Sequence, residues 1–216
     1  PRVEVRFVEG LSANLEKKIA NGEVDFAVVL SDRYNADLVE HEFLREEVYL
    51  CVPEVLLRQY YTPEEIQGIK ERSIQGADLR DFARLPFSLM TNRLGGRIRE
   101  QFRQVGVEPW AFFTGPSTAQ TLPLCASGTA ACFSTNLSLV EQLEQMGEQV
   151  NIFPLMDRGE PMVQRLSLLR HRQRYLTHFA KYFMELLFDS TAALDRIPVL
   201  RVAGGEGAVE KSVENV

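Results

Sequence analysis

Hydrophobic and polar residues alternate at the start of the chain. Residues 1–10, PRVEVRFVEG, place Val3, Val5 and Phe7 between charged neighbours, which is the period-two pattern of a strand with one buried face. Residues 24–30, VDFAVVL, form a nearly continuous apolar run, which is typical of a parallel strand covered on both faces. The two segments therefore predict two strands of one sheet.

The residues between these two segments have helical spacing. Leu15 and Ile19 lie on one face of the predicted helix, Ser12 is expected to cap its start, and Gly22 is expected to follow its last turn in a left-handed conformation. A strand, a helix and a strand within about thirty residues make a βαβ unit.

The rest of the chain continues this alternation. Thr62, Pro63 and Glu65 form a capping box, and a helix starting after Ser117 ends at Gly128. The predicted strands are 46–53, 87–90, 110–114, 129–134, 151–156 and 163–170, and the later predicted helices are 95–105, 118–127, 137–146 and 177–194. Residues 110–134 make a second βαβ unit, so the order of elements indicates an α/β fold.

Composition narrows the class of protein. The chain has 216 residues and a net charge of −6, so it lacks the excess of basic residues that is typical of a domain that binds nucleic acid directly. It has three cysteines, an odd number that argues against a disulfide framework and favours a reducing cytoplasm. No apolar run reaches the length of a membrane span, so no membrane partner is expected.

Several segments together resemble a known family. The stretch 1–29 carries Glu9, Gly10, Gly22, Asp25 and Ala27 in the pattern that opens the effector-binding domain of LysR-type transcriptional regulators. DLRDFARLPFSLM, FRQVGVEP, LPLCASGTAACFST and LSLLRHRQRYLTHFAKYF are similar to later segments of that domain, in the same order. The resemblance covers roughly residues 1–187.

The resemblance implies two Rossmann-like lobes joined by two crossovers, as in type II periplasmic binding proteins. Lobe one would hold 1–85 and 163–194, lobe two would hold 86–162, and 195–216 would be a poorly ordered C-terminal tail. Family members form homodimers or tetramers and bind DNA through an N-terminal helix-turn-helix domain. That domain is missing here and the chain starts at Pro1, so we expect a regulatory fragment.

The resemblance also implies a small-molecule effector held in the cleft between the lobes. Ligands of open α/β sheets bind where strands end and the next helices begin. The expected contacts in lobe one are Leu11, Ser12 and Asn14 in the first turn and Ser31 after the second strand; those in lobe two are Met90, Thr91, Asn92, Arg93, Ser117, Thr118, Gln120, Phe133, Ser134 and Thr135. Arg93 and helix N-termini suit a carboxylate, so a polar or anionic organic molecule is expected.

Other chemistry finds little support in the sequence. His41, His171 and His178 are scattered, so no metal site is expected, and no cofactor motif is recognised. Cys125 and Cys132 are expected to be core residues without redox function. A solute-binding protein of a transporter, built on the same fold, is the alternative. An enzyme is the least favoured class, because no nucleophile–histidine pair or acid–base pair of carboxylates stands near the expected rims.

Overall fold

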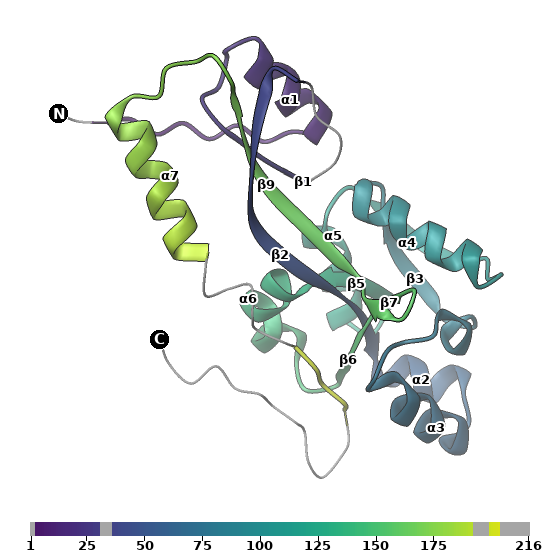
Figure 1. Cartoon of the computed structure of the whole chain (residues 1–216). Helices are drawn as coiled ribbons and strands as arrows, with labels where there is room; N and C mark the ends of the chain where they lie inside the picture. Colours follow the sequence, from purple (N-terminus) through teal and green to yellow (C-terminus); the bar gives the residue numbers. More distant parts are fainter. Residues whose placement is uncertain (1–2, 31–35, 192–198, 204–216) are drawn as a thin grey trace. The chain divides into compact units, whose positions relative to one another are not determined.

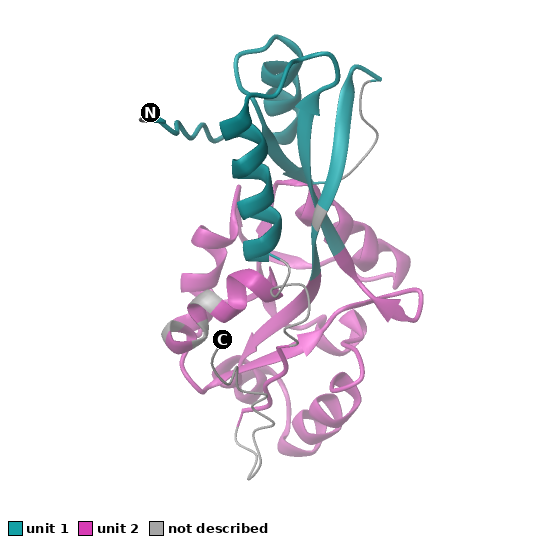
Figure 2. Ribbon diagram, turned by 60° about the vertical axis from the view of Figure 1, so that its left-hand side comes forward, with its two compact units in different colours: residues 1–46, 164–196 teal, residues 47–163, 197–216 magenta. Residues whose placement is uncertain are grey.

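The computed structural model describes residues 3–30, 36–191 and 199–203. The chain forms two compact units, coloured separately in Figure 2: unit 1 holds 1–46 and 164–196, and unit 2 holds 47–163 and 197–216. The family resemblance implies that residues 47–85 belong to lobe one. They belong to unit 2 because the helices α2 (Glu54–Tyr60) and α3 (Pro63–Ser73) bury Leu56, Leu57, Ile66 and Ile69 in its core.

Unit 1 contains helix α1 (Ser12–Ala20), strand β1 (Ala27–Leu30), the first part of β2 (Leu38–Pro53), strand β9 (Val163–His171) and helix α7 (His178–Thr191) (Figure 1). β1 pairs antiparallel with β9, with Ala27 opposite Leu169. Its apolar core is small and is formed by Ile19, Ala27, Val29, Leu38 and Leu169.

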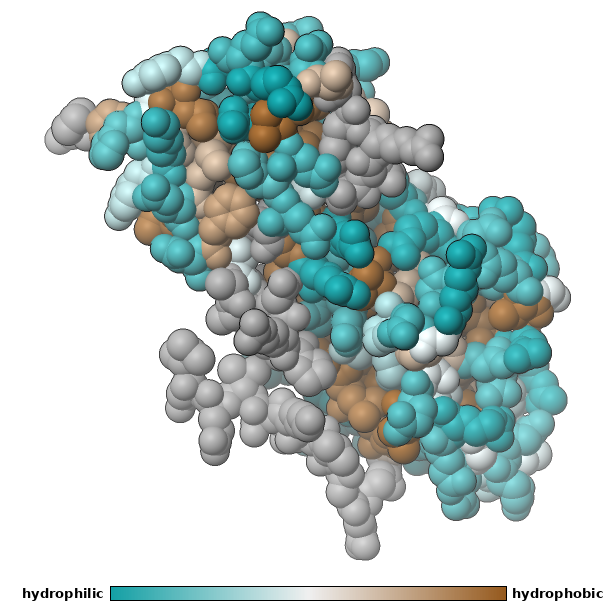
Figure 3. Space-filling view, viewed as in Figure 1, coloured by the Kyte–Doolittle hydropathy of each residue, from teal (hydrophilic) through white to brown (hydrophobic). Residues whose placement is uncertain are grey.

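Both strand predictions at the start of unit 1 differ from the structure. Residues 3–10 form no strand, and Val3, Val5 and Phe7 are 55%, 55% and 84% exposed. β1 is not a parallel strand buried on both faces, because Val28 is 42% exposed beside buried neighbours. The first βαβ unit is therefore absent: alternation shows which face a strand could bury, but not that a hydrogen-bonding partner edge is present. Figure 3 shows apolar side chains, in brown, between hydrophilic ones on the drawn face of this unit.

Unit 2 is built on a mixed sheet. Strand β3 (Pro86–Met90) lies between β4 (Trp110–Gly115) and β5 (Ala131–Thr135) and runs parallel to both. β5 and β6 (Val150–Pro154) pair antiparallel with β2, and a small hairpin joins β7 (Met156–Asp157) to β8 (Glu160–Pro161). The predicted second βαβ unit, residues 110–134, is confirmed as β4, helix α5 (Thr118–Ala126) and β5. Helix α4 (Arg93–Gln104) follows β3, and helix α6 (Asn136–Met146) follows β5.

Three aromatic rings fix α4 against these strands. Phe102 on α4 meets Phe87 on β3 edge to face at 5.1 Å between ring centroids, and it meets Phe133 on β5 at 6.0 Å. Phe87 and Phe133 stack at 5.8 Å, and all three rings are at most 1% exposed. Since each ring comes from a different element, the cluster sets where α4 begins relative to the strand ends.

The segment 199–203 binds to unit 2. Arg201 pairs antiparallel with Ile152 of β6, and the backbone N–H of Ala203 donates to the side chain of Asn151 at 2.9 Å. The Nδ2 of Asn151 donates to Glu54, and the ammonium of Lys70 lies 2.7 Å from the same carboxylate. This part of the expected tail is thus held to β6 by an isolated β-bridge, whereas 192–198 and 204–216 lie outside the described residues.

We expect Glu54→Gln to lower the free energy of unfolding by about 2 kcal/mol near neutral pH, since charge-assisted hydrogen bonds are lost in a buried place. Burial alone raises the pKa of Glu54, but hydrogen bonds from Asn151 and Lys70 and the nearby positive charges outweigh it, so the pKa lies below its usual 4.5. A lowered folded pKa stabilises the protein above the usual value, and this stabilisation disappears as pH falls through the folded pKa. Urea unfolding at a series of pH values should show that the unfolding free energies of the variant and the parent protein converge as the pH falls below 4.5. A difference in unfolding free energy that stays constant down to the lowest pH would contradict this account.

Candidate functional site

The carboxyl ends of three parallel strands meet at one edge of the unit 2 sheet. α4 begins after β3, α5 after β4 and α6 after β5. We call residues 90–93, 115–118 and 134–136 the strand-end rim. At such an edge the backbone N–H groups of the first helical turns point away from the sheet, toward a ligand.

Hydrogen bonds join two of the turns of the rim. The N–H of Thr91 donates to the carbonyl of Gly115 at 2.9 Å. Asn92 caps α4 by accepting from the N–H of Gly95 at 3.0 Å, and its Nδ2 donates to the carbonyl of Pro116 at 3.3 Å. The amide side chain of Asn92 therefore fixes the start of α4 relative to the turn that precedes α5.

Gly95 lets α4 start very close to the strand that precedes it. A Cβ at this position would lie 1.8 Å from the carbonyl oxygen of Met90, so no side chain fits there. The same carbonyl accepts a hydrogen bond from the guanidinium of Arg99 at 2.6 Å. Sequence reasoning missed this residue, although Gly95-Gly96 three residues after a capping Asn is a visible signal in the sequence.

The electrostatics of the rim favour an anion. None of the first turns of α4, α5 and α6 carries an acidic residue. The positive ends of three helix dipoles are therefore not neutralised within their own helices. Arg93 is the first residue of α4 and adds a full positive charge there.

The predicted lobe-two residues differ in accessibility. Thr91 and Gln120 are exposed, and Asn92, Arg93, Ser117 and Thr118 are half-buried. Met90 and Phe133 are 2% and 1% exposed, and their side chains belong to the apolar core of unit 2. Phe133 was expected to line a cleft wall; it points into the core because it stacks on Phe87.

Ser117, Ser134 and Thr135 occupy the ends of elements as predicted. Ser117 is the N-cap of α5, but its hydroxyl makes no cap hydrogen bond. Ser134 is fully buried, and its hydroxyl has no hydrogen-bond partner among the described residues. Thr135 precedes α6, and its hydroxyl donates to Ser138 at 3.4 Å. The ligand contacts of these residues stay predictions.

The lobe-one residues lie in unit 1. Leu11, not Ser12, is the N-cap of α1, and Ser12 is the first helical residue, so the predicted side-chain cap is wrong. Backbone N–H groups of Asn14 and Leu15 both bond the Leu11 carbonyl, which any residue type can provide. Asn14 is exposed, and Ser31 lies outside the described residues. The expected cleft between the lobes stays a prediction.

The three cysteines are buried and unpaired. Cys51 and Cys132 lie opposite each other on β2 and β5, and the thiol of Cys125 donates to the carbonyl of Cys51 at 3.6 Å. The hydrogen bond to Cys132, together with burial, raises the pKa of Cys51 well above its usual value, and burial raises that of Cys125. These are protonated thiols packed in a core, and they are poor nucleophiles.

Within residues 3–30, 36–191 and 199–203, no three or more His, Cys, Asp or Glu side chains lie together as ligands for a metal ion. No helix in these ranges is long and apolar enough to cross a bilayer.

Polar helix N-termini at the ends of parallel strands are a place where α/β domains commonly bind small molecules. The fold is of the type II periplasmic-binding-protein-like class. The LysR substrate binding domain model matches residues 1–192, so the chain belongs to that family. The family is a class of binding domains of transcriptional regulators rather than a class of enzymes, and it favours a regulator over a transporter's solute-binding protein.

Individual relatives agree with this assignment. The chain is 26% identical over 225 residues to the uncharacterized HTH-type transcriptional regulator YcgK of Bacillus subtilis (strain 168), and it covers 64% of that protein's length. HinK, a LysR family transcriptional regulator from Pseudomonas aeruginosa, matches at a TM-score of 0.65 and 16% identity, over 88% of this chain and 61% of that one. The effector binding domain of QuiR in complex with shikimate matches at a TM-score of 0.61 and 14% identity, over 85% and 79% of the two chains.

Proposed function

We propose that this chain is the sensing part of a cytoplasmic transcriptional regulator and that it binds a small organic anion at the strand-end rim. The observation that carries the proposal is the meeting of three helix N-termini, with no acidic residue in their first turns, at one sheet edge. The shikimate bound by the QuiR domain is a carboxylate of this general class. Free buried thiols fit a reducing compartment.

We further propose that the whole protein is a homo-oligomer and that it binds DNA through a helix-turn-helix domain. The relative from Bacillus subtilis is named as an HTH-type regulator, and this chain spans 64% of its length. The acidic charge of −6 supports this division, because contacts to DNA phosphates need basic residues elsewhere in the protein. Ligand binding would regulate DNA binding only as far as the ligand prefers one of two arrangements of the domain.

Thr91→Ala is expected to weaken effector binding about tenfold, because one neutral hydrogen-bonding group at the rim is removed. The fold should persist, since among the described residues the hydroxyl of this exposed side chain makes one weak hydrogen bond, to the carbonyl of Gly115 at 3.5 Å. A thermal-shift screen against small carboxylates finds the ligand, and calorimetry then compares the variant with the parent protein.

Thr129→Ala is the matched control for this experiment. Its hydroxyl is hydrogen-bonded to Ser127 at 2.9 Å, and it stands before β5, at the end of the sheet away from the rim. Equal affinity of all three proteins for the ligand would refute the placement of the site at the rim.

A further inference from the structure

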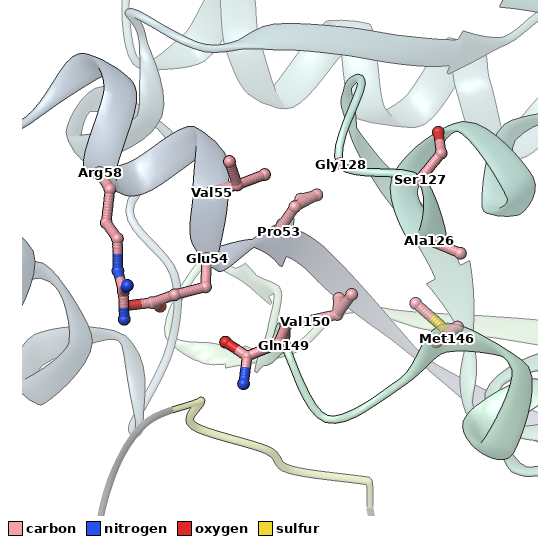
Figure 4. Close-up of a pocket in the computed structure, with 10 residues that line it drawn as sticks. All are labelled: Pro53, Glu54, Val55, Arg58, Ala126, Ser127, Gly128, Met146, Gln149 and Val150. Atoms are coloured by element: carbon pink, nitrogen blue, oxygen red, sulfur yellow. The ribbon is translucent and has the colours of Figure 1, made fainter.

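A cavity opens in unit 2, at the opposite end of the sheet from the strand-end rim. It has a volume of about 250 Å³ and is bounded by the start of α2, the C-terminal ends of α5 and α6 and the start of β6. Ser127 and Gly128 of its wall precede β5, whereas the rim follows β5, so the strand separates the two places. We call this cavity the distal pocket (Figure 4).

Part of the lining is apolar. Met146 and Val150 are 3% and 2% exposed and belong to the apolar cluster beneath α5 and α6, and Val55 adds a branched side chain from α2. A Cβ at Gly128 would lie 2.7 Å from Val55, so the glycine allows the two walls to approach closely. An apolar cavity of roughly 150 Å³ can hold benzene, so this pocket has room for a ring and a polar group.

The charges at the pocket leave a positive group available. The carboxylate of Glu54 is occupied by Lys70 at 2.7 Å and by Asn151 at 3.0 Å. Among the described residues, Arg58 makes a single hydrogen bond, from Nε to Glu54 at 3.4 Å. Its two Nη groups therefore remain as donors, on a side chain that is 68% exposed, and Figure 4 shows the guanidinium lying beside that carboxylate at one side of the pocket.

The remaining polar lining suits the same kind of ligand. The amide of Gln149 can donate to an oxygen, whereas the hydroxyl of Ser127 already donates to the carbonyl of Leu124 at 3.0 Å. A cationic ligand would have to displace Lys70 or Arg58 from Glu54, because these two cations already outnumber the one carboxylate. A planar carboxylate, by contrast, matches the forked donors of arginine without breaking an existing pair.

We propose that the distal pocket binds a small monocarboxylate with an apolar body about the size of one ring. The carboxylate lies on Arg58 and Gln149, and the body packs against Met146 and Val150. The distal pocket is a separate site from the strand-end rim, and evidence against one of the two proposed sites does not count against the other.

Methionine methyl groups can report on the two places separately. The chain has five methionines, of which Met146 lines the distal pocket, whereas Met90 is buried at the end of β3, with its sulfur 3.7 Å from the Nδ2 of the rim residue Asn92. Benzoate is a suitable probe, since its ring shifts the resonances of methyl groups that it contacts, and benzyl alcohol is the uncharged counterpart. In protein labelled with carbon-13 at the methionine methyls, benzoate should shift Met146 saturably in a titration carried to roughly 20 mM, beyond the millimolar affinity expected for so small a ligand.

Two variants and one control test the assignment. Arg58→Gln should weaken the Met146 response at least about tenfold, and benzyl alcohol should bind weakly for the same reason, since the ion pair is absent. Ala126→Leu, at an exposed lining position, should abolish the response by filling the cavity. Arg103→Gln should leave it unchanged; Arg103 is also 68% exposed and also pairs with a glutamate on its own helix.

The possible outcomes separate the two sites. A saturable Met146 shift that depends on Arg58 supports the distal pocket, whether or not Met90 responds. No saturable Met146 shift, or one that Arg58→Gln leaves intact, overturns it. A response of Met90 without one of Met146 places the action of benzoate away from the distal pocket and also overturns the proposal.

Discussion

Gly95→Ala is expected to destabilise unit 2 by at least about 3 kcal/mol, because overpacking against rigid backbone is costly. The added Cβ would lie 1.8 Å from the carbonyl oxygen of Met90, and the first turn of α4 would have to leave the end of β3. The same shift would disturb the capping hydrogen bond that the N–H of residue 95 donates to the Oδ1 of Asn92 at 3.0 Å. The variant should therefore unfold at a lower urea concentration and also lose effector affinity.

Gly96→Ala is the neighbouring control. A Cβ at this position meets no atom within 4 Å. Alanine favours a helix over glycine, so this change should stabilise the protein by about 0.5–1 kcal/mol. If urea unfolding shows equal effects for the two substitutions, the close approach of α4 to β3 is not as described.

The other large effect concerns the aromatic cluster. Phe102→Ala is expected to cost about 3–5 kcal/mol, which corresponds to a fall in Tm on the order of 10 °C for a chain of this size. The fully buried ring contacts Phe87 and Phe133, so its removal leaves a cavity between α4, β3 and β5. Calorimetric melting measures the loss.

Phe112→Ala serves as the comparison for Phe102→Ala. Phe112 lies on β4 in the same unit but is 52% exposed, so truncation should change Tm by only a few degrees. A similar fall in Tm for the two variants would contradict the conclusion that Phe102 packs α4 against β3 and β5.

Local signals in the sequence predicted unit 2 well. The capping box at Thr62 and Glu65 is present with both of its hydrogen bonds. Gly128 adopts a positive φ after a helix of this unit, as its position indicated, and Gly22 does the same in unit 1. These features depend on neighbours close in sequence, so a single sequence contains the information that specifies them.

The failures involve partners far apart along the chain. Residues 3–7 have the alternation of a strand but are exposed, and no pattern within the segment could show the absence of a partner. β1 pairs antiparallel with β9, more than a hundred residues later, which a local βαβ pattern cannot foresee. Likewise, 199–203 looked like a loose tail because its partners, β6 and Lys70, lie elsewhere in the sequence.

For the candidate site as well, the sequence predicted the features that depend on local order and missed those that depend on packing. The rim on unit 2 was visible as polar residues after each predicted strand, and Asn92 proved to be a cap as well as a rim residue. Sequence position could not show that Phe133 points into the core, because a strand that ends at a rim still alternates its side chains between faces. Gly95 was missed because only its distance from Met90 explains why it is glycine.

The most direct test of the account is a map of backbone amide shifts on binding the small carboxylate that raises Tm most in the screen. We predict that the amides of residues 92–95 and 117–121 shift together and saturate at one ligand concentration, because the ligand lies on the first turns of α4 and α5. Saturable shifts confined to other residues, with these amides unchanged, would contradict the central claim that the strand-end rim binds the effector.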